Sequence, residues 1–507
     1  MISKITKVLP KICLITPPSP FLLDERVFVH LGILRVASIL EHQGYPVDFI
    51  DLSGITNYLD VIASYDHPQC TTFGLTASTP QVPYAVQVCH KIKEHNPNAK
   101  VILGGPHCTL MHAAAKREKK KNINNGSRAS KDIKQLLEIF DVLVCGDGEF
   151  AIFEALEIDK GVVDADNTKS PLFLTKQQFS DLPMPARHLI DFSTYRYSID
   201  NFPATSLIAQ LGCPFHCTFC SGRHSPFLRK IRQRSSESVL QEIDFLYKQY
   251  GFTGFMFYDD ELNVNKNMVE LMNMIADYQE KNGVEFRLRG FVKAELFNEK
   301  QAQAMVRAGF RWLLTGFESG DDRILHNIKK IAKKADNTRC VEIAKKYGLK
   351  VKALLSVGHA GESAETIENT KQWLLDVQPE EFDCTIITTY PGSPYFDDAV
   401  LHNDHYMYED PRNGDRLYQK AVNYLTELDY YKGDPTDGYI SYVWTDHLSA
   451  SDLVQLRGEL ESEVREKLNI PFNPARKSII YEHSMGMGNV TLPSHILRSS
   501  ETVRIKT

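Results

Sequence analysis

Three cysteines in one short loop constrain this chain more than any other feature. Cys213, Cys217 and Cys220 stand at spacings of four and three residues, directly after an apolar run over residues 206–209 that predicts a strand. Three thiolates held this close together repel one another unless something binds them. A disulfide with one spare thiol, a zinc ion and an iron–sulfur cluster are the partners to weigh. Phe219 and the Ser-Gly pair after Cys220 suit a loop that wraps a bulky cluster.

The overall composition of the chain argues against several classes of protein. The 507 residues suffice for two or three domains, and they are 43% apolar and 24% charged, with a net charge of −6. This balance gives no electrostatic reason to expect a nucleic-acid partner. No run of about 18 apolar residues occurs, so no membrane span is predicted. Residues 1–10 lead directly into a strand-like segment, which argues against a signal peptide.

The other cysteines are scattered singly through apolar segments. Residues of this kind behave as small buried hydrophobes rather than as a disulfide framework. A reducing cytoplasm fits this usage and would protect an oxygen-labile cluster, so we expect a cytoplasmic protein. The seven residues are Cys13, Cys70, Cys89, Cys108, Cys145, Cys340 and Cys384.

Residues 1–158 predict a doubly wound parallel sheet. Short apolar runs of strand character cover residues 11–16, 47–52, 72–75, 101–103 and 141–144. Amphipathic helical patterns separate several of these runs, and strands alternating with helices form right-handed parallel sheets with helices on both faces. A ligand then binds beyond the carboxyl ends of the strands. Small, glycine and polar residues gather there: Thr76, Ser78, Gly104, Gly105, His107, Gly146, Asp147, Gly148 and Glu149.

A proline-rich linker over residues 159–200 precedes a second βα region over residues 201–395. We expect six strands there, at residues 206–209, 254–258, 285–288, 312–317, 351–357 and 382–388. Asp259 and Asp260 follow the second strand. Glu318 and Ser319 lie in a Gly-Phe-Glu-Ser-Gly segment that ends the fourth. Polar side chains at these carboxyl ends are where a barrel of parallel strands carries its chemistry.

Taken together, these motifs resemble the radical S-adenosylmethionine (SAM) family whose members carry a cobalamin-binding domain. The resemblance spans about residues 10–395, and the cysteine loop is its most specific part. It implies a partial (β/α)6 barrel in which Cys213, Cys217 and Cys220 hold a [4Fe–4S] cluster. It also implies SAM contacts from Phe219, Asp259, Asp260, Arg287, Arg289, Glu318 and Ser319. The implied cobalamin contacts are Thr76, Ser78, Gly104, Gly105, His107, Gly146, Asp147 and Glu149.

The resemblance also implies an activity. The predicted enzyme is a cobalamin-dependent C-methyltransferase that uses a 5′-deoxyadenosyl radical and methylcobalamin on an unactivated carbon of a small molecule or peptide. An external flavodoxin-like or ferredoxin-like protein would donate the electron. The D-x-H-x-x-G signature that places a histidine below cobalt in other cobalamin proteins is absent. We therefore expect His107 to contact the corrin edge or solvent.

Several alternatives stay open at this point. His216 and His224 lie in or near the cysteine loop, so a Cys3His zinc knuckle is chemically possible. A cobalamin-dependent cyclase or ring-rearranging oxidoreductase would use the same motifs. A non-catalytic cobalamin or metal sensor would need no SAM site, and the carboxylates Asp259, Asp260 and Glu318 argue against it.

Two segments lie outside these motifs. Residues 116–134 are rich in Lys and Asn and predict a solvated surface insertion, with a basic docking patch as the alternative. Residues 396–507 form a capping region that we expect to close the barrel mouth, with a short strand pair at 439–444 and a helix at 451–467. The tail beyond residue 479 carries no motif that predicts a structure.

Overall fold

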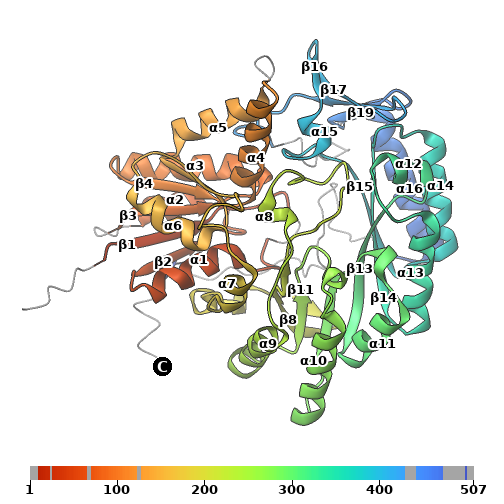
Figure 1. Cartoon of the computed structure of the whole chain (residues 1–507), viewed down its shortest axis with the longest axis horizontal. Helices are drawn as coiled ribbons and strands as arrows, with labels where there is room; N and C mark the ends of the chain where they lie inside the picture. Colours follow the sequence, from red (N-terminus) through yellow and green to blue (C-terminus); the bar gives the residue numbers. More distant parts are fainter. Residues whose placement is uncertain are drawn as a thin grey trace, which may run out of the picture.

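The predicted strands build two parallel sheets that lie side by side (Figure 1). The computed structural model describes residues 9–22, 25–65, 70–122, 127–428, 441–471 and 497–499. The first sheet belongs to the red-to-orange third of the chain and the second to its green-to-blue part. Within these residues no helix is both long and apolar enough to cross a bilayer.

The first sheet has six parallel strands in the order β2-β1-β3-β4-β5-β6, which confirms the predicted doubly wound fold. Short β20 (Leu497–Ser499) pairs antiparallel with β2 at one edge. The winding direction reverses between β1 and β3, the kind of switch point where such sheets bind ligands. The six strands are β1 (Lys11–Thr16), β2 (Val47–Asp51), β3 (Cys70–Thr76), β4 (Lys100–Gly104), β5 (Val142–Gly146) and β6 (Gly161–Ala165). Because β6 pairs with β5, this domain extends past the predicted boundary at residue 158.

Helices cover both faces of the first sheet because its strands are apolar on both sides. In β1, Ile12 and Leu14 pack against one cluster of helices, while Cys13 and Ile15 pack against the other. The first cluster takes in α1 (Leu31–His42) and α6 (Gly148–Glu157). The second takes in α2 (Tyr58–Ser64), α3 (Val82–His95), α4 (Pro106–Lys120) and α5 (Arg128–Ile139).

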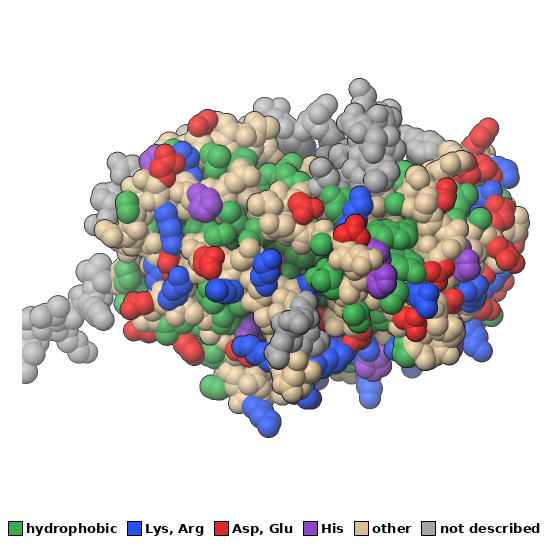
Figure 2. Space-filling view, turned by 90° about the horizontal axis from the view of Figure 1, so that it is seen from above, with side chains coloured by type: hydrophobic (Ala, Val, Ile, Leu, Met, Phe, Trp, Pro, Cys, Tyr) green, Lys and Arg blue, Asp and Glu red, His purple; other side chains and the backbone are tan. Residues whose placement is uncertain are grey.

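Most of the predicted surface segment over residues 116–134 is helical, and residues 119–122 within it are exposed. Helix α4 continues to Lys120, and α5 begins at Arg128. Residues 123–126 lie outside the described part. Seen from above, Lys and Arg side chains gather toward the lower middle of the face on which α4 ends (Figure 2).

The second sheet curls into the predicted half-barrel, with six parallel strands from β8 to β15. Hairpin strand β7 (Ser198–Ile199) adds antiparallel to β8. The six strands are β8 (Phe202–Leu207), β11 (Gly254–Phe257), β12 (Arg287–Phe291), β13 (Phe310–Glu318), β14 (Lys350–Val357) and β15 (Glu381–Ile386). The first and third differ from the predicted 206–209 and 285–288. The outer helices are α9 (Ser236–Tyr250), α10 (Met268–Asn282), α11 (Glu299–Arg307), α13 (Lys334–Lys346) and α14 (Ala364–Val377).

Alternation along the barrel strands separates an outer from an inner face. Phe255, Leu288 and Leu313 join the large core formed with the outer helices. Their neighbours Met256 and Trp312 join a smaller cluster with residues of the chain that precedes β8. The inner face is therefore the side from which polar residues of these strands can reach a bound molecule.

The C-terminal region adds a small antiparallel sheet and one long helix. The sheet contains β16 (Val400–His402), β17 (His405–Glu409), β18 (Arg416–Lys420) and β19 (Val443–Thr445). Helix α16 (Ala450–Leu468) agrees with the prediction and packs beside α14 and β15. Of the strand pair predicted at 439–444, the described residues include β19, which pairs with β18, and residues 429–440 lie outside the described part. Shorter helices are α7 (Lys176–Asp181), α8 (Pro226–Arg229), α12 (Asp322–Asn327) and α15 (Pro394–Asp397).

A buried ion pair joins the two sheets. Asp147, between β5 and α6, accepts hydrogen bonds from Arg232 Nη1 at 2.6 and 2.5 Å and from the Leu174 amide at 2.9 Å. Arg232 lies on β10 (Arg232–Gln233), the strand paired with β9 (Gln210–Leu211), and both charged side chains are 1% exposed. Asp166 adds hydrogen bonds from the Ser225 hydroxyl and the Phe227 amide. These contacts fix the carboxyl edge of the first sheet against the cysteine loop.

Removal of Asp147 tests this junction. We predict that Asp147→Ala lowers the free energy of unfolding by about 3–5 kcal/mol, because the Arg232 charge stays buried without a partner. The double variant Asp147→Leu/Arg232→Met removes both charges, so its free energy of unfolding should fall clearly less than that of the single variant. Urea unfolding of the three proteins measures this difference, and equal losses in the single and double variants would contradict it.

Candidate functional site

The cysteine loop leaves the barrel between β9 and α8, and glycine begins it. Gly212 has a φ of +88°, and a Cβ there would lie 2.3 Å from the Lys230 carbonyl oxygen. Only glycine fits such a position without strain. The Cys213 amide then donates to the Leu228 carbonyl at 2.9 Å. The loop is thereby closed at its base by α8.

Residues after β13 hold the far side of the loop. The Thr218 amide donates to the Ile328 carbonyl at 2.8 Å, and the Thr218 hydroxyl donates to the Asn327 carbonyl at 3.1 Å. The Phe219 ring packs against the cluster of Ile324, Leu325 and Ile328. These contacts hold residues 213–220 in one conformation without using a cysteine side chain.

The three thiols of the loop are available as ligands. All ten cysteines are free, and Cys220 is exposed while Cys213 and Cys217 are half-buried. Burial raises the pKa of Cys213 to about 11. A bound metal centre would offset this cost and hold the sulfurs as thiolates.

The histidines of the loop have other partners. Arg223 contacts the Nδ1 atom of His216, and Arg229 Nη2 lies 3.1 Å from the same atom. His224 contacts Arg117 and lies 3.6 Å from Asp397. Across the residues that the structure describes, no set of three His, Cys, Asp or Glu side chains is positioned to hold a single metal ion. Guanidinium groups beside both histidines disfavour the Cys3His zinc alternative.

The paired aspartates after β11 bind the backbone that leads into the loop. Asp259 accepts a hydrogen bond from the Ala209 amide at 2.8 Å, and Asp260 accepts one from the Gly212 amide at 3.0 Å. Burial raises the pKa of Asp259 to about 7. Asp259 is 1% exposed, and its Oδ2 atom is buried without a hydrogen-bond partner among the described residues. Asp260 is exposed and accepts the Gly212 hydrogen bond through Oδ2, which leaves its Oδ1 atom open to a ligand.

Glu318 ends β13 beside a buried lysine. Its backbone has a φ of +67°, an uncommon value for a residue with a Cβ. The Ser356 hydroxyl donates to one carboxylate oxygen at 2.9 Å, and Lys330 Nζ lies 3.4 Å from the other. Burial of Lys330 disfavours its charged form, but the neighbouring Glu318 and Cys217 favour that form and raise the pKa of Lys330. Ser319 is turned away, since its hydroxyl lies 3.0 Å from that of Thr370.

The two arginines predicted to contact SAM lie away from the carboxyl ends of the barrel strands, where the other predicted SAM contacts gather. Arg287 is the first residue of β12, where it pairs with Glu285 at 2.8 Å and covers the Phe202 ring at 4.4 Å. It lies at the amino end of the strand, away from the cysteine loop. Arg289 is fully buried at mid-strand, with its guanidinium beside the Tyr197 hydroxyl. The structure therefore brings Asp260, Glu318 and the loop together, but not Arg287.

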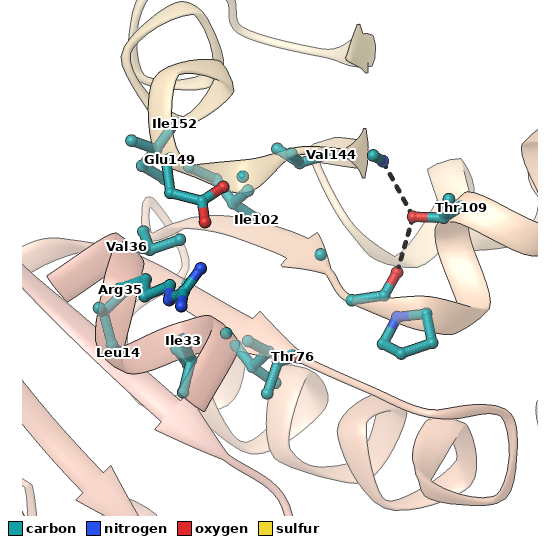
Figure 3. Close-up of a pocket in the computed structure, with 18 of the residues that line it drawn as sticks. Leu14, Ile33, Arg35, Val36, Thr76, Ile102, Thr109, Val144, Glu149 and Ile152 are labelled. Carbon is teal, nitrogen blue, oxygen red and sulfur yellow. Dashed lines mark hydrogen bonds between the residues drawn. The ribbon is translucent and has the colours of Figure 1, made fainter. Parts of the chain in front are cut away.

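A cavity of about 280 Å³ lies at the carboxyl edge of the first sheet. Five of the eight predicted cobalamin contacts line it, namely Thr76, Gly104, Gly105, Gly146 and Glu149. Figure 3 shows Glu149 and Arg35 pointing toward the same space from α6 and α1. The rest of the wall is mostly aliphatic, and its branched aliphatic members from the first domain are Leu14, Ile33, Val36, Leu75, Ile102, Val144 and Ile152.

Gly104, Gly105 and Gly146 form one edge of this cavity, which we call the glycine edge, and the backbone there is closely packed. Gly105 has a φ of +98°, and a Cβ there would lie 2.6 Å from the Thr76 hydroxyl oxygen. The Thr109 hydroxyl donates to the Gly105 carbonyl at 3.1 Å and accepts from the Gly146 amide at 2.9 Å (Figure 3). The polypeptide backbone itself therefore forms this part of the wall, as a large flat ligand requires.

Three predicted contacts lie outside the cavity wall. Ser78 bonds to Gln81, and Asp147 pairs with Arg232. His107 is fully buried, with Nδ1 3.2 Å from the Thr79 hydroxyl and Nε2 3.2 Å from Asp132. The expectation that His107 meets solvent is wrong, because α4 begins at Pro106 and turns this side chain toward α5.

Sequence reasoning missed the part of the wall that the second domain supplies. Ile208, Leu211 and Phe227 line the same cavity, and Leu211 stands two residues before Cys213. The apolar run before the loop suggested a strand, but its last residues lie beyond β8 and cover the edge of the other sheet. One cavity is therefore shared by the glycine edge and the base of the cysteine loop.

Comparison with known proteins finds two family profiles in this order. The B12 binding domain matches residues 25–128, and the Radical SAM superfamily matches residues 207–374. The chain belongs to the radical SAM enzymes that carry a B12-binding domain. Its cofactors are accordingly cobalamin, SAM and a [4Fe–4S] cluster. The glycine edge of the cavity fits cobalamin, and the three free thiols of the loop fit the cluster.

Individual relatives agree with this family. An uncharacterized methyltransferase of Pyrococcus horikoshii is 27% identical over 78% of this chain and 84% of its own length. An anaerobic magnesium-protoporphyrin IX monomethyl ester cyclase of Rubrivivax gelatinosus is 26% identical over 72% of this chain and 65% of its own length. The fold matches the radical SAM methyltransferase TsrM of Kitasatospora setae, solved with cobalamin and a [4Fe–4S] cluster. That match has a TM-score of 0.59 and 16% identity, and covers 92% of this chain and 90% of TsrM.

Substitutions at two adjacent glycines separate binding from folding. A Cβ at Gly104 meets no atom closer than 3.9 Å, so Gly104→Val should fold while its side chain fills the cavity. We predict at least a tenfold loss of cobalamin affinity for Gly104→Val, measured by absorbance titration of the reconstituted protein. Gly105→Ala should instead lower the melting temperature, because its Cβ collides with Thr76. Wild-type affinity in a folded Gly104→Val protein would contradict this cobalamin site.

Proposed function

We propose that the protein is a cobalamin-dependent radical SAM methyltransferase that methylates an unactivated carbon of a small molecule or peptide. The observation that carries this proposal is the shared cavity, whose wall combines Gly104 and Gly105 with Leu211 beside the cysteine loop. When bound, the cluster supplies the electron that cleaves SAM, SAM supplies the radical, and cobalamin supplies the methyl group. Leu211 and Phe227, which stand on either side of the cysteine loop in the sequence, line the same cavity as these glycines and so support the proposal.

The side chains around the loop divide the work of holding these groups. Cys213, Cys217 and Cys220 ligate the cluster, and the hydrogen bonds of Asp259 and Asp260 fix the backbone before it. We assign the free oxygen of Asp260 and the carboxylate of Glu318 to the polar groups of SAM. Lys330 supplies a buried positive charge beside Glu318 and Cys217.

The cavity wall suits the binding of a corrin. Its aliphatic side chains exclude water and can pack against a large flat ring. Glu149 and Arg35 are the charged groups at its rim, and they can bond to the amide side chains of a corrin. Burial, and then the nearby Arg234, lowers the pKa of Arg35 to about 10, so the side chain stays charged at neutral pH.

We keep the proposed division into a cobalamin domain, a linker, a radical SAM domain over about 201–395 and a C-terminal cap, with the first domain extended to residue 165. A cyclase or ring-rearranging reaction is the second candidate, because the cyclase of Rubrivivax gelatinosus matches 72% of this chain. The two reactions differ in whether a methyl group leaves SAM.

Product analysis separates the candidates. Anaerobically reconstituted protein, with cobalamin, SAM, a chemical reductant and a panel of candidate substrates, should form 5′-deoxyadenosine and S-adenosylhomocysteine together. 5′-Deoxyadenosine alone would indicate the cyclase-type reaction. Neither product from cluster-loaded protein would contradict both candidates.

A pair of cysteine variants tests the cluster assignment in the same assay. Cys217→Ala should lose most of the bound iron and both products. Cys340→Ala removes a buried thiol from α13 and should retain both. Full iron content and activity in Cys217→Ala would contradict the assignment.

A further inference from the structure

A buried histidine with no role in the proposed function lies behind Glu318. His359 follows β14 and is 0% exposed, whereas the Glu318 side chain at the end of β13 is 15% exposed. The Ser356 hydroxyl lies between the two side chains, 2.9 Å from Glu318 Oε2 and 2.8 Å from His359 Nε2. One hydroxyl group therefore joins the buried histidine to the carboxylate that we assign to SAM.

The available acceptors determine where the hydrogens of this chain of groups lie. A carboxylate only accepts hydrogen bonds, so the single hydrogen of the Ser356 hydroxyl points to Glu318. The Ser356 oxygen then accepts from His359, which requires the imidazole hydrogen to be on Nε2. Nδ1 is left as an acceptor and faces the Tyr395 hydroxyl at 3.5 Å. The oxygen of that hydroxyl accepts from the Ala360 amide at 3.3 Å, so its hydrogen can point to His359.

The charges nearby agree with this arrangement. Lys330 Nζ lies 3.4 Å from Glu318 Oε1, so a positive charge stands beside the carboxylate. Burial, and then Lys330, lowers the pKa of His359 to about 3, so the imidazole is neutral at physiological pH. A neutral imidazole carries one N–H donor and one acceptor nitrogen, as the chain of hydrogen bonds requires.

Glu318 needs support from its neighbours because its backbone conformation is uncommon. A φ of +67° is costly for a residue with a Cβ and persists only where the surrounding structure holds it. Among the described residues, Lys330 and Ser356 bond to the carboxylate, one to each oxygen. Each carboxylate oxygen can accept a second hydrogen bond. The carboxylate is thus held from behind while it can still bind hydroxyl groups of a ligand.

His359 also packs against the cysteine loop. Its ring centroid lies 5.3 Å from that of Phe219, the residue before the last cysteine of the loop. On another side the Tyr395 ring centroid lies 6.1 Å away, and the Tyr395 amide donates to the Thr218 carbonyl at 3.4 Å. The same histidine therefore contacts both the loop of the cluster and the hydroxyl that reaches the SAM carboxylate partner.

We propose that His359 is a positioning residue for SAM, whose Nε2–H group fixes the Ser356 hydroxyl and thereby orients Glu318. The inference rests on the proposed function, in which Glu318 bonds to polar groups of SAM. His359 acts through Ser356 because its own side chain is fully buried. A residue without this donor would leave the Ser356 oxygen buried without its partner and the carboxylate less firmly oriented.

Two substitutions at residue 359 separate orientation from packing. His359→Gln keeps an N–H donor near the place of Nε2, whereas His359→Phe keeps an aromatic ring and removes the donor. Ser356→Ala breaks the same link without changing the histidine, and Glu318→Ala removes the carboxylate itself. Calorimetry on anaerobic, cluster-loaded protein without reductant measures the affinity for SAM while SAM stays intact. Thermal unfolding and iron analysis of the same samples show whether each variant is folded and loaded.

The proposal expects His359→Phe and Ser356→Ala to bind SAM on the order of tenfold more weakly than the wild type, because each loses one buried hydrogen bond behind the carboxylate. His359→Gln should stay within about threefold of the wild-type affinity, because it restores the donor. Bound iron should be the same in all of these proteins, since no cysteine ligand is changed.

Two results would overturn the proposal by itself. One is wild-type SAM affinity in His359→Phe and Ser356→Ala when Glu318→Ala binds SAM weakly. The other is a loss in His359→Gln as large as that in His359→Phe or larger, which would assign the histidine to packing against Phe219. Wild-type SAM affinity in Glu318→Ala would contradict the role of Glu318 in the proposed function, and this proposal with it.

Discussion

The ion pair between Asp147 and Arg232 is the contact on which the arrangement of this molecule depends. It is buried, and it joins the turn after β5 of one sheet to the strand that flanks the cysteine loop of the other. A buried pair contributes little net stability, but each charge demands its partner and so selects one packing of the two domains. That packing lets Leu211 and Phe227 cover the glycine edge of the cobalamin domain.

The cysteine loop is held by neighbours on three sides. Helix α8 closes its base, Asp259 and Asp260 bind the backbone before it, and the segment after α12 binds Thr218. None of these contacts uses a thiol, so the sulfurs remain available for the cluster. Cations on the outer side and aliphatic residues on the cavity side then give the loop two different faces.

Much of this architecture could be predicted from the sequence, because parallel strands buried on both faces leave long apolar runs such as residues 11–16. Cavity residues at strand ends, such as Gly104 and Gly105, follow from the same pattern. His107 could not be predicted in this way, since its direction depends on how α4 starts. Arg287 was misplaced because β12 begins two residues later than its apolar pattern suggests. The place of Leu211 in the cavity wall depends on how the two domains pack together, and a repeating pattern along the sequence does not predict that packing.

The central claim is that cobalamin and the cluster face one cavity. Electron paramagnetic resonance of protein loaded with both cob(II)alamin and the reduced [4Fe–4S] cluster tests it most directly. The shared wall predicts spectra in which each signal is split or broadened by spin–spin interaction with the other, and both changes should vanish when either group is left out. A spectrum equal to the sum of the two separate signals would contradict the claim.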